Sequence, residues 1–166
     1  MARQHKVNPI RGSHLPVLLR AMKATNGPVL ELGAGLYSTP VLHTLCQIEG
    51  RKLVTYEGDP DFFEWATNYQ TSFHDVIKVD NWEDIDLASV NWSVAFVDHA
   101  PDSRRWEEIL RLTHAEYVVA HDSDRGWRNK YSYHKVYPLF KYQKQYREAR
   151  PNTVILSNTH PLEDMW

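Results

Sequence analysis

The sequence predicts a single α/β domain in which a mostly parallel sheet lies between two layers of helices and ends in an antiparallel hairpin. Short apolar runs recur at residues 29–32, 52–57, 75–79, 94–97 and 117–120, and each is followed by polar residues. Helical patterns separate most of these runs, which is typical of strands that run parallel. The length of 166 residues suits one domain and leaves no room for a separate substrate domain.

Charge and hydropathy give no reason to expect a membrane or a nucleic acid as the main partner. The formal net charge is −2, so no global basic surface attracts polyanions. No segment approaches the apolar length of a membrane span or a signal peptide. We therefore expect a cytoplasmic protein without a membrane partner.

Residues 1–13 are predicted to form a flexible N-terminal arm, because they are basic and contain Pro9 and Gly12 but no apolar run. The alternative is that this arm orders over a bound ligand as a lid. Residues 14–25 are predicted to form an amphipathic helix that stops at Asn26 and Gly27. Its apolar positions recur at helical spacing, at Leu15, Leu18, Leu19 and Met22.

The chain is organised around residues 28–39, an apolar strand that breaks at Gly33 and Gly35 and restarts as a helix. The glycines permit a tight turn and a close approach of the backbone to a ligand, and Ser38 or Thr39 is expected to cap the helix. The free N–H groups and the positive dipole end of that helix favour anionic or strongly polar ligand groups. The stretch therefore predicts a pocket for a nucleotide-like ligand.

The motif Glu31-x-Gly33-x-Gly35, followed by a hydroxyl residue, resembles the first motif of the class I, Rossmann-like S-adenosylmethionine-dependent methyltransferases. The dinucleotide fingerprint differs, since it has a third glycine where this chain has Ser38 and no acid at the position of Glu31. The resemblance implies that S-adenosylmethionine is the cofactor. It also implies that the methionine end is held by Glu31 and by the loop residues Gly33, Ala34, Gly35, Tyr37, Ser38 and Thr39.

Glu57 ends the second predicted strand about 20 residues after the glycines, where an acid accepts hydrogen bonds from both hydroxyls of an adenosine ribose. The alternative is a solvated acid in an acidic loop. Between the two strands, residues 40–49 are predicted as a helix ended by Gly50. Cys46 lies among its apolar positions, so we interpret it as a small buried hydrophobe and not as a nucleophile.

A helix is expected over residues 61–72, and the third strand is followed by Asp80, Asn81 and Trp82. In the methyltransferases that the chain resembles, this corner meets the adenine, which implies that these three residues contact it. The alternative for Trp82 is packing, because the chain contains six tryptophans.

The fourth and fifth strands end in Asp98-His99 and in His121-Asp122, with a helix over residues 102–113 between them. The carboxyl ends of parallel strands share one edge of the sheet, so these side chains should converge beside the pocket. Asp98 and Asp122 match the positions where catechol O-methyltransferase and its relatives hold Mg²⁺, although Ser123 stands where those enzymes have Asn. A cephamycin-type group instead pairs His121 with Asp122.

The metal set implied by these resemblances is therefore Asp98, His121 and Asp122. Oxygen ligands favour Mg²⁺ as the metal, whereas a histidine ligand would open the site to Mn²⁺ or Fe²⁺. In the alternative without a metal, Asp98 caps a helix and Asp122 ties down a loop. His99 is predicted to be the general base beside Asp98, because imidazole titrates near neutral pH. The catalytic candidates are thus His99 and Asp98.

Residues 125–150 contain eight Lys and Arg, one acid and five tyrosines, and predict the segment that binds the methyl acceptor. A short helix is expected over residues 127–137, and residues 140–146 and 153–157 are expected to pair as the hairpin. Tyrosines and cations also suit a nucleic acid, but a patch this short favours a small or acidic molecule.

Together these features predict a methyltransferase-like domain over residues 14–166 that transfers a methyl group to the oxygen of a small molecule, with a divalent metal assisting. The alternative is a non-catalytic module that binds S-adenosylmethionine as a sensor or scaffold. A nucleic-acid methyltransferase and an NAD-dependent enzyme are less favoured. A homodimer is also expected, because a short chain ending in Trp166 has little material to close its site.

Overall fold

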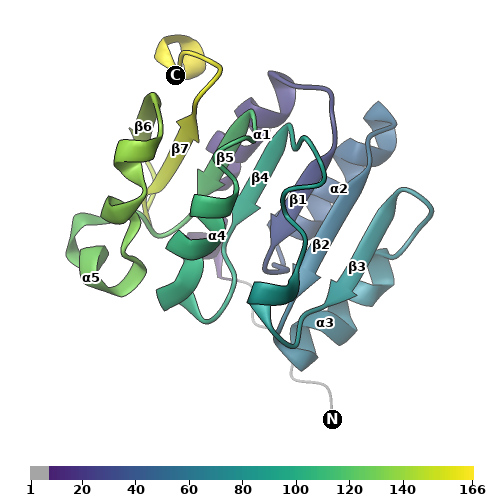
Figure 1. Ribbon diagram of the computed structural model, residues 1–166. Coiled ribbons are helices and arrows are strands. Elements are labelled where there is room, and N and C mark those ends of the chain that lie inside the picture. The colour runs from purple at the N-terminus through teal and green to yellow at the C-terminus, as the bar shows by residue number, and fades with distance from the viewer. Residues whose placement is uncertain (1–7) are drawn as a thin grey trace.

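The computed structural model describes residues 8–166, apart from the side chains of Pro9, Arg128 and Asn129. It contains one seven-stranded sheet, with the strand order β3-β2-β1-β4-β5-β7-β6 (Figure 1). The first five strands pair in parallel, and β7 is antiparallel to both β5 and β6. The strands are β1 Val29–Leu32, β2 Leu53–Glu57, β3 His74–Lys78, β4 Val94–Val97, β5 Tyr117–Ala120, β6 Tyr142–Tyr146 and β7 Thr153–Ser157.

Helices cover both faces of the sheet, which confirms the predicted three layers (Figure 1). Apolar residues of α1 and α2 pack with one set of strand side chains, and α4 packs with the other set. Cys46 of α2 is fully buried in the first of these clusters, as predicted. The helices are α1 Leu15–Lys23, α2 Ser38–Glu49, α3 Pro60–Ala66, α4 Arg105–Arg111 and α5 Arg128–Tyr131. Among the described residues, none of them is long and apolar enough to cross a membrane.

Four predicted helices are shorter than expected, and one of them is α1, which spans Leu15–Lys23 where residues 14–25 were predicted. α3 passes into a 3-10 turn at Thr67–Tyr69, and the helix expected from residue 102 begins as a 3-10 turn at Asp102–Arg104. α5 stops at Tyr131 because Ser132 adopts a left-handed backbone with φ 54°. The following residues then form 3-10 turns, so the acceptor segment is mostly irregular.

The cap predicted for α2 is wrong. Tyr37 occupies the N-cap position without a side-chain cap, and the helix begins at Ser38. The Thr39 hydroxyl instead accepts a hydrogen bond from the Gly35 N–H at 3.0 Å and donates to the Glu31 carboxylate. Thr39 thereby links the loop to an acid in the sheet beneath it.

Gly33 is the point where the end of β1 comes closest to the loop after β4. Its φ is +93°, and a Cβ atom there would lie 2.6 Å from the Cα atom of His99. No side chain fits without moving that backbone. Gly50 also has a positive φ, of +67°, but a Cβ there would meet nothing within 4 Å.

We expect Gly33→Ala to destabilise the protein more than Gly50→Ala. Gly50→Ala should lower the free energy of unfolding by about 1 kcal/mol, the cost of the left-handed backbone. Gly33→Ala should lose about 2 kcal/mol more, because a steric clash with His99 adds to the same backbone cost. Urea unfolding of both variants measures the difference, and equal losses would show that the close approach is not a constraint.

Candidate active site

The loop from Gly33 to Gly35 is held in place by acids on two strands. The Ala34 N–H donates to Glu57 Oε2 at 2.6 Å. The Gly35 N–H donates to the Thr39 hydroxyl, which in turn donates to the Glu31 carboxylate. The loop backbone is therefore fixed from β2 on one side and from β1 below. A backbone held in this way is preorganised for a ligand.

Glu31 lies beneath the loop, fully buried and outside the cavity described below. The hydroxyls of Thr39 and Thr55 donate to its carboxylate at 2.9 and 2.7 Å. Burial raises its pKa to about 7, against the opposing effect of its hydroxyl donors, of which Ser38 has the largest effect. Glu31 therefore lies where it supports the loop from below, and it does not face the cavity in which a ligand would bind.

A cavity of about 500 Å³ opens at the carboxyl ends of β1, β2, β4 and β5. Residues of the loop and the start of α2 line it, and the strand-end residues Glu57, Asp98 and His121 face it from the other strands. The lining from the first region is Ala34, Gly35, Leu36, Tyr37 and Ser38. The cavity therefore lies where the sequence predicted the cofactor pocket.

Part of the predicted N-terminal arm borders this cavity. Residues 8–13 are ordered around a 3-10 turn at Pro9–Gly12, and Asn8, Ile10 and Arg11 line the cavity. Gly12 packs against the Tyr37 ring, where a Cβ atom would lie 3.1 Å from the nearest ring carbon. This placement favours the lid alternative for residues 8–13, while residues 1–7 lie outside the described part of the chain.

Glu57 retains free acceptor capacity toward the cavity. Its two oxygens accept one backbone N–H each, from Ala34 and Asp59, both at 2.6 Å. A carboxylate offers about four lone-pair sites, so acceptor capacity remains for a ligand. Burial raises the pKa of Glu57, and the backbone N–H groups of Asp59, Ala34 and Gly58 oppose that rise.

The corner after β3 does not line the cavity. The Asp80 side chain is 90% exposed and lies 3.5 Å from Lys78 Nζ. Asn81 caps the 3-10 turn Trp82–Asp84 by accepting the Glu83 N–H. Trp82 is buried against the His99 ring, with ring centroids 4.0 Å apart. Of the two roles considered for Trp82, adenine contact and packing, its position is that of packing. The adenine contact of Asp80 and Asn81 stays a prediction.

A network of four charged side chains joins the ends of β4 and β5. Arg105 Nη1 lies 2.9 Å from Asp98 Oδ1 and 3.0 Å from Asp122 Oδ2. His121 Nδ1 lies 3.1 Å from Asp98 Oδ2. Asp122 takes a left-handed backbone with φ 59° and also accepts the Tyr131 hydroxyl. The strand-end residues converge as predicted, but around a guanidinium that the sequence analysis did not single out.

The predicted Mg²⁺ site between Asp98 and Asp122 does not fit this arrangement. A carboxylate pair attracts Mg²⁺ only while its oxygens are free of another cation. Here one guanidinium nitrogen already lies between the two carboxylates. Buried as it is, Arg105 keeps its charge, because Asp98 and other neighbours raise its pKa against the effect of burial.

His121 carries a proton on both ring nitrogens in this structure. The Ser13 hydroxyl has one proton, which it donates to the Pro151 carbonyl at 2.7 Å. The His121 Nε2 atom, 2.9 Å from Ser13 Oγ, must therefore donate, and Nδ1 donates to the Asp98 carboxylate. Burial opposes this charge, but the hydrogen bond to Asp98 raises the pKa of His121 overall.

His99, the predicted general base, borders the first cavity but is almost fully enclosed. It is 1% exposed, and its Nε2 is 2.9 Å from Glu108 Oε2. Its Nδ1 is buried without a hydrogen-bond partner among the described residues. Burial lowers its pKa against the effect of Glu108. His99 packs between Trp82 and Glu108, and its role as a general base stays a prediction.

His14 is a site residue that the sequence analysis missed. It is 2% exposed, lines the cavity and lies beside Asp98 and His121. A single histidine at the start of a predicted helix gives no signal of its own. Its place depends on α1 packing against β4 and β5, which a local pattern does not reveal.

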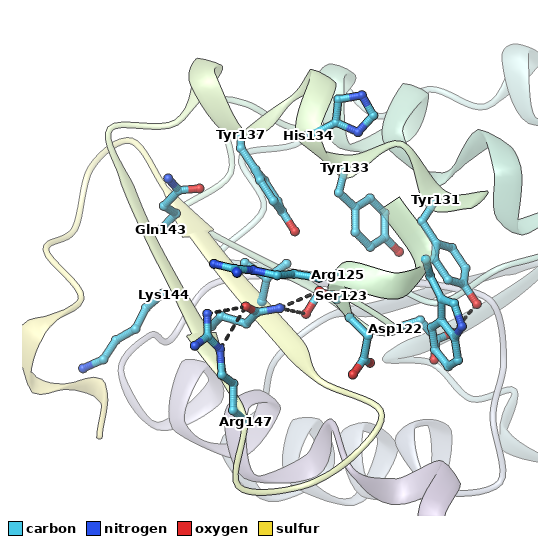
Figure 2. A pocket seen from close by; sticks show the side chains of 14 residues that line it. Asp122, Ser123, Arg125, Tyr131, Tyr133, His134, Tyr137, Gln143, Lys144 and Arg147 are labelled. Carbon is cyan, nitrogen blue, oxygen red and sulfur yellow. Dashed lines mark hydrogen bonds between the residues drawn. The ribbon is translucent and has the colours of Figure 1, made fainter. Parts of the chain in front are cut away.

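A second cavity, of about 720 Å³, lies between the hairpin and the segment after β5 (Figure 2). Asp122 lines both cavities. The rings of Tyr131, Tyr133 and Tyr137 lie along one side, and the Arg125 side chain reaches across the opening (Figure 2). The segment predicted to bind the acceptor thus forms a pocket next to the first cavity.

Fold and topology are those of the class I S-adenosylmethionine-dependent methyltransferases. A putative O-methyltransferase from Klebsiella pneumoniae aligns with a TM-score of 0.65 and 15% identity, over 95% of this chain and 84% of that chain. Cofactor-bound Rv0187 from MTB aligns with a TM-score of 0.65 and 14% identity, over 96% and 84%. The Bacillus cereus O-methyltransferase in complex with SAH gives 0.59 and 13%, over 94% and 84%.

No protein-family model matches this sequence, and no curated protein matches it either. The resemblance is therefore one of fold, at sequence identities too low to transfer a substrate.

We expect Glu31→Gln to remove a pH dependence of stability. A raised pKa in the folded state means that the contribution of Glu31 to stability is present at low pH and is lost as pH rises from its ordinary value to about 7. The unfolding free energy of the wild type, relative to Glu31→Gln, should therefore fall by about 3 kcal/mol between pH 4 and pH 8. Urea unfolding at several pH values measures this difference. A difference that stays constant across this range would contradict the assigned burial of the charge.

Proposed function

We propose that the protein is an S-adenosylmethionine-dependent methyltransferase that acts on an oxygen of a small, acidic acceptor. The observation that carries the proposal is the first cavity, where a fixed glycine loop, the start of α2 and the half-satisfied Glu57 carboxylate meet Asp98 at the strand ends. The likeness of the fold to methyltransferases that bind SAH supports the same cofactor. We assign the domain to residues 14–166, with the N-terminal arm contributing to the cavity.

The residues present fit the cofactor. Glu57 has lone pairs for two ribose hydroxyls, and the first turn of α2 presents N–H groups that no helical carbonyl accepts. A Cβ atom on Gly35 would lie 2.9 Å from Ser38 Oγ, so a larger residue there would displace the Ser38 hydroxyl. S-adenosylmethionine supplies a methyl group on a sulfonium, whose departure needs no further activation.

The protein's own contribution is to position the acceptor and to exclude water. Asp98 lines the cavity, and both its oxygens are already held, by Arg105 and by His121. Burial would raise the pKa of Asp98, but the charge of Arg105 and the bond to His121 lower it. A carboxylate with a lowered pKa orients an acceptor hydroxyl better than it deprotonates one.

The second cavity supports a negatively charged acceptor. Lys144 is engaged with the carbonyls of Leu162, Glu163 and Trp166, and Arg147 donates to Gln145. The Arg125 guanidinium has no partner among the described side chains and reaches into the pocket beside three tyrosine rings (Figure 2). A cation without a partner among aromatic rings suits a small anion with a planar or apolar body.

One observation favours a second candidate, a sensor that binds the cofactor without turnover. His99 is engaged with Glu108, and both nitrogens of His121 are engaged with Ser13 and Asp98. His121 therefore has no ring nitrogen free to act as a base, and His99 has only its buried Nδ1 atom. The two candidates differ in turnover and not in cofactor binding.

We expect calorimetric titration with S-adenosylmethionine to show saturable binding that Glu57→Ala weakens about 10- to 100-fold, because two hydrogen bonds to a charged acceptor are lost. Glu57→Gln keeps one acceptor oxygen for the backbone donors, so its affinity for S-adenosylmethionine should lie between those of the wild type and Glu57→Ala. Glu64→Ala is the matched control, since Glu64 is an exposed acid on α3, the helix that follows Glu57. Binding that is unchanged in folded Glu57→Ala would remove the cofactor assignment.

We also expect methyl transfer to small hydroxy acids and not to the corresponding hydroxy amides, because Arg125 selects the charge. Arg125→Ala should raise the KM for an accepted acid about 10-fold, the loss of one charge-assisted contact. Its affinity for S-adenosylmethionine should not change. Lys141→Ala, on the exposed hairpin surface, serves as the control. Tritium transfer from labelled cofactor measures turnover, and cofactor binding without turnover on any member of the panel would favour the sensor.

A further inference from the structure

The His14 side chain is buried without any hydrogen bond. Its ring is 2% exposed, and neither Nδ1 nor Nε2 has a partner among the described residues. The ring packs against Phe96, with centroids 4.6 Å apart, and meets the edge of the His121 ring at 4.8 Å. Buried polar atoms in proteins almost always have partners, so this imidazole is positioned for a ligand that the protein itself does not supply.

One ring nitrogen of His14 lies close to two other potential metal ligands. One atom each of His14, Asp98 and His121 lies within 4.8 Å of the others. His121 Nδ1 and Asp98 Oδ2 are already 3.1 Å apart. Ligands that bind one ion at about 2.1 Å lie about 3 to 4 Å from each other, so a movement of about 1 Å completes the set.

Most of the surrounding contacts orient this set, and one of them is replaced when an ion binds. Asp98 Oδ1 pairs with Arg105, whereas Oδ2 accepts the hydrogen bond from His121 Nδ1, so an ion takes the place of the proton between these two atoms. His121 is held at Nε2 by Ser13, so Nδ1 can exchange its proton for a metal. Hydrogen bonds of this kind, to the far side of each ligand, are usual around metal sites. All three residues line the first cavity, which leaves further coordination positions open.

We infer that His14, Asp98 and His121 bind one transition-metal dication, of the class of Zn²⁺, Fe²⁺ or Mn²⁺, at the floor of the first cavity. Two imidazoles and one carboxylate suit these ions, whereas Mg²⁺ prefers a set made of oxygens alone. The site differs from the predicted set of Asp98, His121 and Asp122 in that His14 takes the place of Asp122. Metal binding here does not depend on the proposed methyl transfer.

The test is metal binding by the full-length protein, without S-adenosylmethionine, after treatment with a chelator. Calorimetry with Zn²⁺ and Mn²⁺ should give one site, with Mg²⁺ binding at least about 100-fold more weakly. Saturating Zn²⁺ should raise the Tm by about 5 °C or more. His14→Phe should abolish both effects while keeping the packing on Phe96. His114→Phe, at an exposed histidine, is the matched control and should retain them.

The chelated His14→Phe protein should melt at or above the wild-type Tm, because the substitution removes unpaired polar atoms and breaks no hydrogen bond. If that variant does not fold, His14→Leu replaces it. Wild-type protein that binds Zn²⁺ and Mn²⁺ no better than Mg²⁺ overturns the inference. Folded His14→Phe that binds Zn²⁺ as tightly as the wild type overturns it as well. Cofactor binding is measured separately, so either outcome leaves the methyltransferase proposal untouched.

Discussion

The structure depends on the buried guanidinium of Arg105 at the carboxyl ends of β4 and β5. It donates to the backbone carbonyls of Asp98 and His99 at 3.0 and 2.7 Å and pairs with the carboxylates of Asp98 and Asp122. The two strand-end loops are thereby fixed relative to each other. Leaving any of these groups unpaired in a buried site would be costly, so the contacts form together or not at all.

This network decides the chemistry that the site offers. Two carboxylates are balanced by Arg105 and by the protonated His121, so the strand ends carry little net charge despite their acids. A carboxylate pair neutralised from within is a poor magnesium site, and a histidine bonded at both nitrogens is a poor base. The proposed methyl transfer therefore relies on positioning. His14 is the one site histidine that has no hydrogen bond at either ring nitrogen among the described residues.

The glycine loop has an equally indirect support. Glu31 never reaches the cavity, yet it accepts the Thr39 hydroxyl that in turn accepts the Gly35 N–H. Glu57 holds the neighbouring Ala34 N–H and still faces the cavity. The two acids of the sequence motif thus have different positions, one beneath the loop and one beside the ligand. These two glutamates therefore have different chemical roles, because one is buried beneath the loop and the other faces the cavity.

The sequence by itself determined the order of strands and helices, the glycine turn and the acids at the strand ends. These features depend on alternation, short-range backbone geometry and the rule that parallel strands share an edge, all of which are local or topological. Only the tertiary structure decided how the site residues pair. Ser13 and His121 are 108 positions apart, and α1 must pack beneath β4 and β5 before His14 meets Asp98. No local pattern encodes which helix delivers a side chain across the sheet, so the roles of Arg105, His14 and Ser13 followed from packing alone.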